Sequence, residues 1–209
     1  MSIITISRTY CSGGSKVAAL IADALGWSLL DNGFIDEVAS RTGMSTSEVA
    51  AREERRPSLA ERVATAMAMS TQEMMSPLAI AQFPPTEQRL LDVTRAVIEE
   101  AASRASVVIV GRGAQMMLCS RSDVFGVFCY APLEALTRGC MQRDQLDHAH
   151  AEKHVLQVNQ ERSAWVRANW GRDWRGIEHY HLCVNTDALG VDGAADAVVR
   201  AAQAFFERG

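Results

Sequence analysis

The segment Ile3–Gly26 constrains the fold most, because a short apolar run, a glycine-bearing turn and an apolar helix follow one another directly. Residues Ile3–Ile6 are β-branched and predict a buried strand. After the polar turn Arg8–Ser15, apolar residues recur at helical spacing up to Gly26, a residue type that often ends helices. In this order a helix N-terminus presents unpaired N–H groups and the positive end of its dipole to an anion. The segment therefore predicts a phosphate-binding loop.

The turn matches the Walker pattern of phosphate-binding loops, G-x-x-x-x-G-K-[ST], only in part. With Ser15 as the last position, the chain reads R-T-Y-C-S-G-G-S, so that Gly13 and Ser15 fit. Arg8 stands in place of the first glycine, Gly14 stands in place of the lysine, and Lys16 lies two positions late. A glycine turn that joins a strand to a helix and binds no ligand therefore remains the alternative.

The composition is that of a globular protein. Of 209 residues, 48% are hydrophobic and 22% are charged, and the formal net charge is −4. The negative charge argues against a general binder of nucleic acid or anionic membranes, and no apolar run approaches the roughly 18 residues of a membrane span. Because the N-terminus enters a strand directly, we expect no signal peptide and a cytoplasmic location.

The cysteines form no C-x-x-C pair, and several of them lie in apolar, strand-like runs. This pattern favours free thiols buried in a protein of the reducing cytosol. The five residues are Cys11, Cys119, Cys129, Cys140 and Cys183.

Strands and helices alternate along the chain, which predicts an α/β fold with a parallel sheet between two layers of helices. Further strands are predicted at residues 27–30, 106–110, 124–130 and 182–185, and helices at 34–42, 86–104, from 132, at 148–170 and at 192–206. The region 32–85 is predicted to be a helical insertion. It contains a methionine-rich helix for which we expect core packing, with a face for homo-oligomer formation as the alternative. Its methionines are Met67, Met69, Met74 and Met75.

Two charged residues follow predicted strands directly. Asp31 ends the run 27–30, and Arg112 stands between two glycines after the run 106–110. Open α/β sheets bind ligands at the carboxyl ends of their strands, and an arginine at such a position can hold a phosphate group. A capped turn at Asp31 and a surface turn at Arg112 are the alternatives.

Six segments together resemble the cytidylate kinase-like family of P-loop nucleoside monophosphate kinases, over nearly the whole chain. They are ITISRTYCSGGSKVA, LLDNGFIDEVASRTG, VVIVGRGA, YAPLEALTRGCMQR, NQERSAWVRANWGRDW and HYHLCVNTDALG. In this family the first loop commonly has Gly-Ser-Gly-Gly and then a basic residue, so the missing Walker lysine is a trait that the resemblance predicts. The resemblance implies a three-layer α/β/α kinase fold in one domain, 1–209, with an acceptor-binding insert at about 32–85 and a helical lid at about 138–175.

The resemblance also implies ATP as the phosphoryl donor and Mg²⁺ as its partner ion. Backbone N–H groups of Ser12, Gly13 and Gly14 would bind the donor β-phosphate. Ser15 would hold Mg²⁺ through its hydroxyl group, and Lys16 occupies the family's basic position after the glycines.

On the acceptor side, the resemblance implies a nucleoside monophosphate, with CMP or dCMP as the first candidates, or a similar small acceptor. Arg112 matches the motif that grips the acceptor phosphate, and Asp31 matches an acidic residue near the magnesium ion or the acceptor. Arg143 and Arg162 would be lid arginines that close over the transferred phosphoryl group. Phosphoryl transfer depends on such positioning and charge neutralisation more than on an acid–base pair.

Three residues depart from the family pattern. Cys11 replaces a loop glycine, and its place near a helix N-terminus predicts a lowered pKa and a reactive thiol. Leu136 stands where a lid arginine is expected, and Asn159 replaces an aspartate three positions before Arg162. These departures leave two alternatives to a kinase: a nucleotide-binding regulatory protein with little or no turnover, and a structural protein that keeps only the fold.

Overall fold

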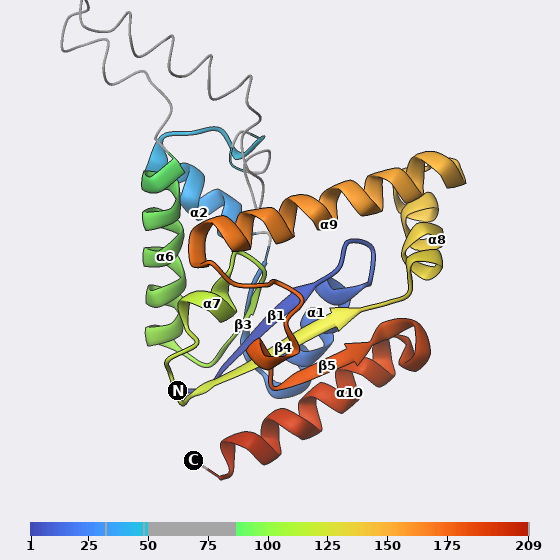
Figure 1. Ribbon diagram of the computed structural model, residues 1–209. Coiled ribbons are helices and arrows are strands. Elements are labelled where there is room, and N and C mark those ends of the chain that lie inside the picture. Colours follow the sequence, from blue (N-terminus) through green and yellow to red (C-terminus); the bar gives the residue numbers. More distant parts are fainter. Residues whose placement is uncertain (32, 48, 50–86, 209) are drawn as a thin grey trace, which may run out of the picture.

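A five-stranded parallel sheet forms the centre of the fold over the described residues, 1–31, 33–47, 49 and 87–208, of this computed structural model (Figure 1). The strands are β1 (Ile3–Arg8), β2 (Ser28–Leu30), β3 (Val107–Val110), β4 (Val124–Tyr130) and β5 (Leu182–Asn185). The central strands β1, β3 and β4 are almost entirely buried. Their continuous apolar runs are typical of strands that are covered on both faces.

The strand order is β2-β3-β1-β4-β5, so β1 lies in the middle of the sheet. Ile3 at the start of β1 pairs with Val107 of β3 on one side and with Val124 of β4 on the other. The chain leaves β1 toward β2 and β3, and later returns to add β4 and β5 on the opposite side. The loop after β1 therefore lies at the switch point of the sheet, where open α/β folds bind their ligands.

Helices cover both faces of the sheet, which confirms the predicted three-layer α/β/α fold (Figure 1). One layer holds α1 (Gly14–Leu25) and α10 (Thr186–Phe206), and the other holds α2 (Gly33–Thr42), α6 (Glu87–Arg104) and α7 (Ala114–Met117). Side chains alternate along β1, so that Ile4 and Ile6 enter the first core and Ile3 enters the second.

Two further helices lie above the carboxyl ends of the strands. They are α8 (Leu133–Asp144) and α9 (His148–Trp170), and α9 crosses over the sheet in Figure 1. Leu136 and Cys140 of α8 pack against Ala151 and Val155 of α9. The Leu136 side chain is thus part of a core, which explains why an apolar residue occupies this position.

Three tryptophans near the end of α9 and just after it pack against one another and against β4. Trp174 lies edge-on to Phe128 of β4, with ring centroids 5.4 Å apart, and Trp165 contacts Trp170. The short helix η2 (Ile177–His179) then leads into β5. These indole rings form a fourth apolar cluster with Met116 and are not arranged as an open stacking surface.

The structure differs from the sequence prediction at the start of α10. The prediction begins this helix at residue 192, whereas it starts at Thr186. The Asn185 side chain accepts hydrogen bonds from the N–H groups of Asp187 and Ala188, so it caps an extra turn. A kink at Gly190 (φ 70°, ψ 169°) then interrupts the helical periodicity that the sequence prediction relies on.

Most of the predicted insertion, 32–85, lies outside the described residues, and so do the methionine-rich helix and the self-association face expected there. The described part of it includes α2, as predicted for residues 34–42. Among the described helices, none combines the length and the apolar composition that a membrane crossing requires.

The contact between β1 and the start of α1 gives a first testable prediction. A Cβ atom at Gly14 would lie 2.5 Å from the Cβ of Arg8 and 3.3 Å from that of Cys129, so Gly14→Ala must push strands and helix apart. We expect a loss of about 1–3 kcal/mol in the free energy of unfolding, measured by urea denaturation. Gly193→Ala in α10 is the matched control, because its nearest neighbour would lie 3.7 Å away; equal stability of the two variants would contradict the prediction.

Candidate functional site

The loop between β1 and α1 has a fixed backbone shape. Thr9 donates from its N–H group to the Cys129 carbonyl at 2.9 Å, and the Ser12 hydroxyl and N–H both donate to the Thr9 carbonyl. Cys11 and Gly13 adopt left-handed conformations, with φ of 62° and 77°. The loop is thus hydrogen-bonded to itself and to β4, and these bonds fix its backbone shape.

The start of α1 has the features of an anion site. Gly13 stands at the N-cap and has no side chain to satisfy the first N–H groups, and the first turn contains no acidic residue. The first helical bond runs from the Val17 N–H to the Gly13 carbonyl. The N–H groups of Gly14, Ser15 and Lys16 therefore lie at the positive end of the helix dipole, next to a basic side chain.

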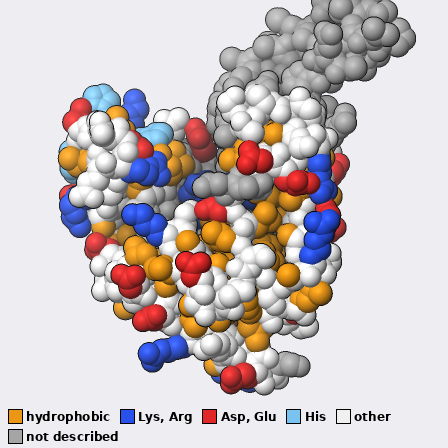
Figure 2. Space-filling model, turned by 180° about the vertical axis from the view of Figure 1, so that it is seen from behind, with side chains coloured by type: hydrophobic (Ala, Val, Ile, Leu, Met, Phe, Trp, Pro, Cys, Tyr) orange, Lys and Arg blue, Asp and Glu red, His pale blue; other side chains and the backbone are white. Residues whose placement is uncertain are grey.

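A cleft of about 600 Å³ opens in front of this loop. Its lining brings together seven of the residues predicted for the site: Ser12, Gly13, Gly14, Ser15, Lys16, Arg143 and Arg162. Figure 2 shows the hollow beside the projecting end of α8 and α9, with basic side chains on the surface around it. This volume is within the range of ordinary small-molecule sites, and its basic lining suits an anion.

Arg143 of α8 is held against the loop. Its guanidinium group lies 4.2 Å from the centre of the Tyr10 ring, hydrogen-bonds the Tyr10 hydroxyl, and donates from Nε to Asp144 at 2.8 Å. The hydrogen bond from Arg143 lowers the pKa of the Asp144 carboxyl to about 2 and raises the pKa of Arg143 itself. Arg143 therefore stays charged at the wall of the cleft.

Arg162 and Asn159 join α9 to the same loop. The Asn159 side chain is buried and accepts a hydrogen bond from the Tyr10 N–H at 2.8 Å. Arg162 donates from Nη1 to the carbonyl of Arg8 at 2.9 Å. The amide oxygen of Asn159 accepts this hydrogen bond from a backbone N–H as a carboxylate oxygen would. The contact is therefore kept although asparagine stands where the family has aspartate.

Arg112 lies on the other side of β1, directly after β3. It has a left-handed backbone (φ 59°), is 4% exposed, and stacks over Phe34 of α2 at 5.1 Å. Its pKa is lowered to about 9, first by burial and then by the nearby charges of Arg8 and Arg162, while Asp31 acts in the opposite direction. A buried cation among other cations gains stability from a bound anion, so this arrangement can bind a phosphate group.

Arg8 and Arg162 connect the two halves of the site. Both line the cleft in front of the loop, and both also line a small cavity of about 10 Å³ beside Gly113. Trp165 and Trp174 line this cavity, and a Cβ atom on Gly113 would collide with the Trp170 ring. Three arginines, including Arg112, thus share one electrostatic environment at the carboxyl end of β1 and β3.

Two interpretations of the sequence need correction. Cys11 was expected to have a lowered pKa, but burial raises the pKa of its thiol because the side chain turns away from the helix end toward α8. The cysteines were expected to be buried, and Cys129 and Cys140 are, but Cys119 is exposed. Arg138 lies two positions after Leu136, where the family pattern predicts a lid arginine, but it pairs at the surface with Glu134 and Asp187.

Sequence reasoning missed Arg8 and Tyr10 as members of the site. In the Walker frame Arg8 is only a mismatch, yet its place at the carboxyl end of β1 could have marked it by the same rule that marked Arg112. Tyr10 gives no such signal, because its contacts come from α8 and α9, which are remote in sequence.

Comparison with known proteins agrees with this architecture. The model of the cytidylate kinase-like family matches residues 3–188. A cytidylate kinase from Ignicoccus hospitalis is 26% identical over 203 residues, which cover 96% of this chain and 98% of that protein.

Two solved structures have the same fold. An uncharacterized protein from Eubacterium ventriosum has a TM-score of 0.70 at 20% identity, over 97% of this chain and 99% of that chain. Shikimate kinase from Bacteroides thetaiotaomicron has a TM-score of 0.56 at 13% identity, over 99% and 98%. At these identities the two structures support the fold alone. The family match, in contrast, spans the loop, Arg112 and both helices above the sheet, and the chain therefore belongs to the cytidylate kinase-like family of P-loop kinases.

Proposed function

We propose that this protein transfers the γ-phosphoryl group of ATP to a nucleoside monophosphate, with CMP or dCMP as the first candidate. The observation that carries the proposal is that Arg8 and Arg162 line both the loop cleft and the cavity beside the Arg112 loop. Two arginines that line the loop cleft and also reach toward the Arg112 loop suit a reaction in which a phosphoryl group passes from one phosphate chain to another. Membership of a kinase family supports turnover over a purely regulatory nucleotide binder.

The donor would bind at the loop. The N–H groups of Ser12, Gly13 and Gly14, with the Lys16 side chain, would hold its phosphates at the start of α1. The exposed Ser15 hydroxyl lines the cleft, and the half-buried Asp31 carboxylate follows β2 outside the cleft lining. Both offer oxygen ligands of the kind that Mg²⁺ prefers, and in this proposal they would hold the ion. When bound, Mg²⁺ supplies neutralisation of the phosphate charge.

The acceptor phosphate would bind Arg112. This guanidinium group is already desolvated and held by the Phe34 ring, so it loses little further solvation or side-chain entropy when an anion arrives. Asp31 lies near enough to influence the pKa of Arg112, which suits a role in orienting the arginine or the acceptor. Arg8 would contribute a second positive charge from the end of β1.

The helices α8 and α9 would serve as the lid. Arg162 lines both the cleft and the cavity beside Gly113, and Arg143 lines the cleft, so both would neutralise charge on the transferred group. Closure of these helices over the cleft would exclude water, which otherwise accepts the phosphoryl group. In this proposal the chain forms one domain, 1–209, in which residues from about 138 to about 175 make up the lid.

Calorimetric titration with ATP and Mg²⁺, followed by transfer assays, tests the proposed function. We expect saturable binding and formation of ADP with one of CMP, dCMP, UMP or AMP, and preference for the cytidine nucleotides. Binding of ATP without phosphoryl transfer to any of these acceptors would contradict the proposed nucleoside monophosphate kinase activity.

Replacement of the buried arginine tests the acceptor side. Arg112→Gln removes the charge and leaves a shorter polar side chain, so we expect kcat/KM for the acceptor to fall by about 10²–10³ while ATP affinity stays within a few-fold. Arg121→Gln is the matched control, because Arg121 is exposed and pairs with Asp123 at the surface. An equal loss in ATP affinity for Arg112→Gln would place this residue on the donor side and refute the assignment.

The hydroxyl group of Ser15 can be tested by a pair of variants. Ser15→Ala removes the proposed magnesium ligand, and we expect kcat at saturating ATP to fall by about 10². Ser15→Thr keeps the hydroxyl, which the Walker pattern also allows, and should retain most of the activity. Steady-state rates over a range of Mg²⁺ concentrations distinguish the two; comparable activity of both variants would remove Ser15 from the site.

A further inference from the structure

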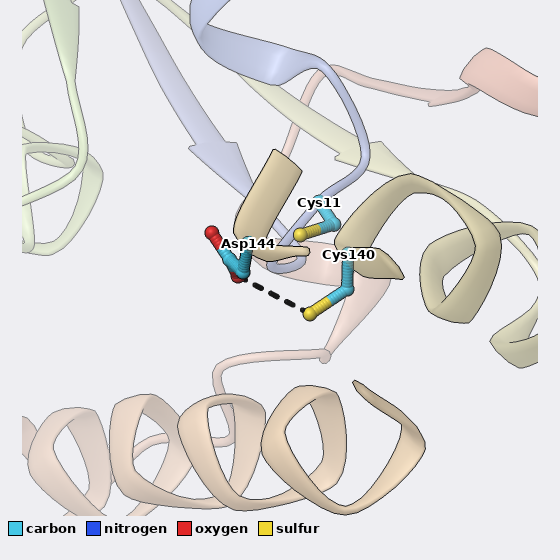
Figure 3. A group of neighbouring side chains, drawn as sticks. All are labelled: Cys11, Cys140 and Asp144. Atoms are coloured by element: carbon cyan, nitrogen blue, oxygen red, sulfur yellow. Dashed lines mark hydrogen bonds between the residues drawn. The ribbon is translucent and has the colours of Figure 1, made fainter. Parts of the chain in front are cut away.

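Two thiols and a carboxylate meet where the loop after β1 contacts α8. Cys11 comes from the loop, and Cys140 and Asp144 come from successive turns of α8 (Figure 3). Their ligand atoms, two sulfurs and a carboxylate oxygen, all lie within 4.8 Å of one another. None of the three side chains has a role in the proposed phosphoryl transfer.

The spacing of these atoms suits a single small ion. The Cys140 thiol donates to Oδ2 of Asp144 at 3.3 Å. A tetrahedral zinc ion with ordinary bond lengths separates two sulfurs by about 3.8 Å, and a sulfur from an oxygen by about 3.5 Å. The three ligand atoms thus need shifts of no more than about 1 Å to share one ion.

The backbone keeps the loop and α8 close at this point. A Cβ atom on Gly139 would lie 3.0 Å from the Cys11 carbonyl oxygen and 3.6 Å from the Cys11 Cβ. A glycine at 139 therefore lets the helix approach the loop, and the left-handed conformation of Cys11 (φ 62°) accompanies a side chain turned toward α8. The two thiols are held in place by the fold and not by flexible surface segments.

The surroundings of Asp144 supply the outer contacts that a metal ligand needs. Arg143 donates to both of its carboxylate oxygens at 2.8 Å, and the Tyr10 hydroxyl donates to Oδ2 at 3.2 Å. Two thiolates, a carboxylate and a divalent cation together carry one negative charge, which the Arg143 guanidinium group balances. Such outer hydrogen bonds orient metal-bound carboxylates.

We propose that Cys11, Cys140 and Asp144 form a binding site for a thiophilic divalent cation of the Zn²⁺ class, which links the loop to α8. Binding replaces the two thiol protons: one ion and two thiols give one complex and two released protons. Cys11 lines the cleft of about 600 Å³, so the ion has a path from solvent and a fourth position for water. The proposal concerns cation binding and stands independently of the phosphoryl acceptor.

Titration with Co²⁺, a spectroscopic substitute for Zn²⁺, tests the site on the full chain kept reduced with a non-thiol phosphine. We expect one ion per chain, a thiolate-to-cobalt charge-transfer band in the near ultraviolet, tetrahedral ligand-field bands in the visible, and loss of both when Zn²⁺ is added. Binding should release two protons and raise the midpoint of thermal unfolding.

Variants assign the ligands. Cys11→Ser and Cys140→Ser should each weaken Co²⁺ binding at least tenfold and reduce the charge-transfer band, and Asp144→Asn should weaken binding while keeping that band. Cys119→Ser is the matched control, because Cys119 is exposed and lies outside the cluster. Far-ultraviolet circular dichroism verifies that each variant folds, and Cys11→Ala repeats the loop test with a second side chain. No cobalt band in the wild-type chain, or an unchanged band in folded Cys11→Ser and Cys11→Ala, would overturn the proposal.

Discussion

The hydrogen bonds between α9 and the loop after β1 hold the candidate site together. Asn159 accepts from the Tyr10 N–H, and Arg162 donates to the Arg8 carbonyl, so a helix that is remote in sequence fixes the backbone of the loop from above. Arg143 of α8 adds a contact with the Tyr10 ring. Through these bonds, the position of α8 and α9 depends on the shape of the loop, and the loop depends on them. Occupation of the cleft in front of the loop is therefore linked physically to the arrangement of the helices above it.

Charge is unevenly distributed at the carboxyl edge of the sheet, and this imbalance is what the site offers to a ligand. The nearby charges of Arg8 and Arg162 lower the pKa of the buried Arg112, while Asp31 acts in the opposite direction. Burying a cation such as Arg112 beside other positive charges is unfavourable, and an added anion reduces that cost. A phosphate group would relieve this repulsion, and the relief would grow as more negative charge develops during phosphoryl transfer. The Phe34 ring, which stacks on the Arg112 guanidinium group, helps to hold this buried cation in position for an anion.

Much of the fold could be predicted from the sequence, because apolar runs and helical periodicity are local signals. Strands β4 and β5 and helix α9 have the predicted bounds. The predicted loop residues and the lid arginines Arg143 and Arg162 line one cleft, although their chemical roles stay predictions. Other features depend on tertiary contacts that no local pattern encodes. Burial against α8 has a larger effect on the Cys11 thiol than the nearby helix end, so its pKa is raised and not lowered. Arg8 becomes part of the site only when β3 and α9 pack beside β1. The kink at Gly190 interrupts the periodicity, so the sequence pattern does not reveal the first turn of α10.

The central claim is that donor and acceptor regions adjoin across the shared arginines. The most direct test is calorimetric binding of a bisubstrate analogue, adenosine and cytidine joined by five phosphates, in competition with the separate nucleotides. The account predicts one bound analogue per chain, an affinity well above that of ATP, and displacement by ATP and by CMP. An analogue that binds no more tightly than ATP and that CMP does not displace would contradict the claim.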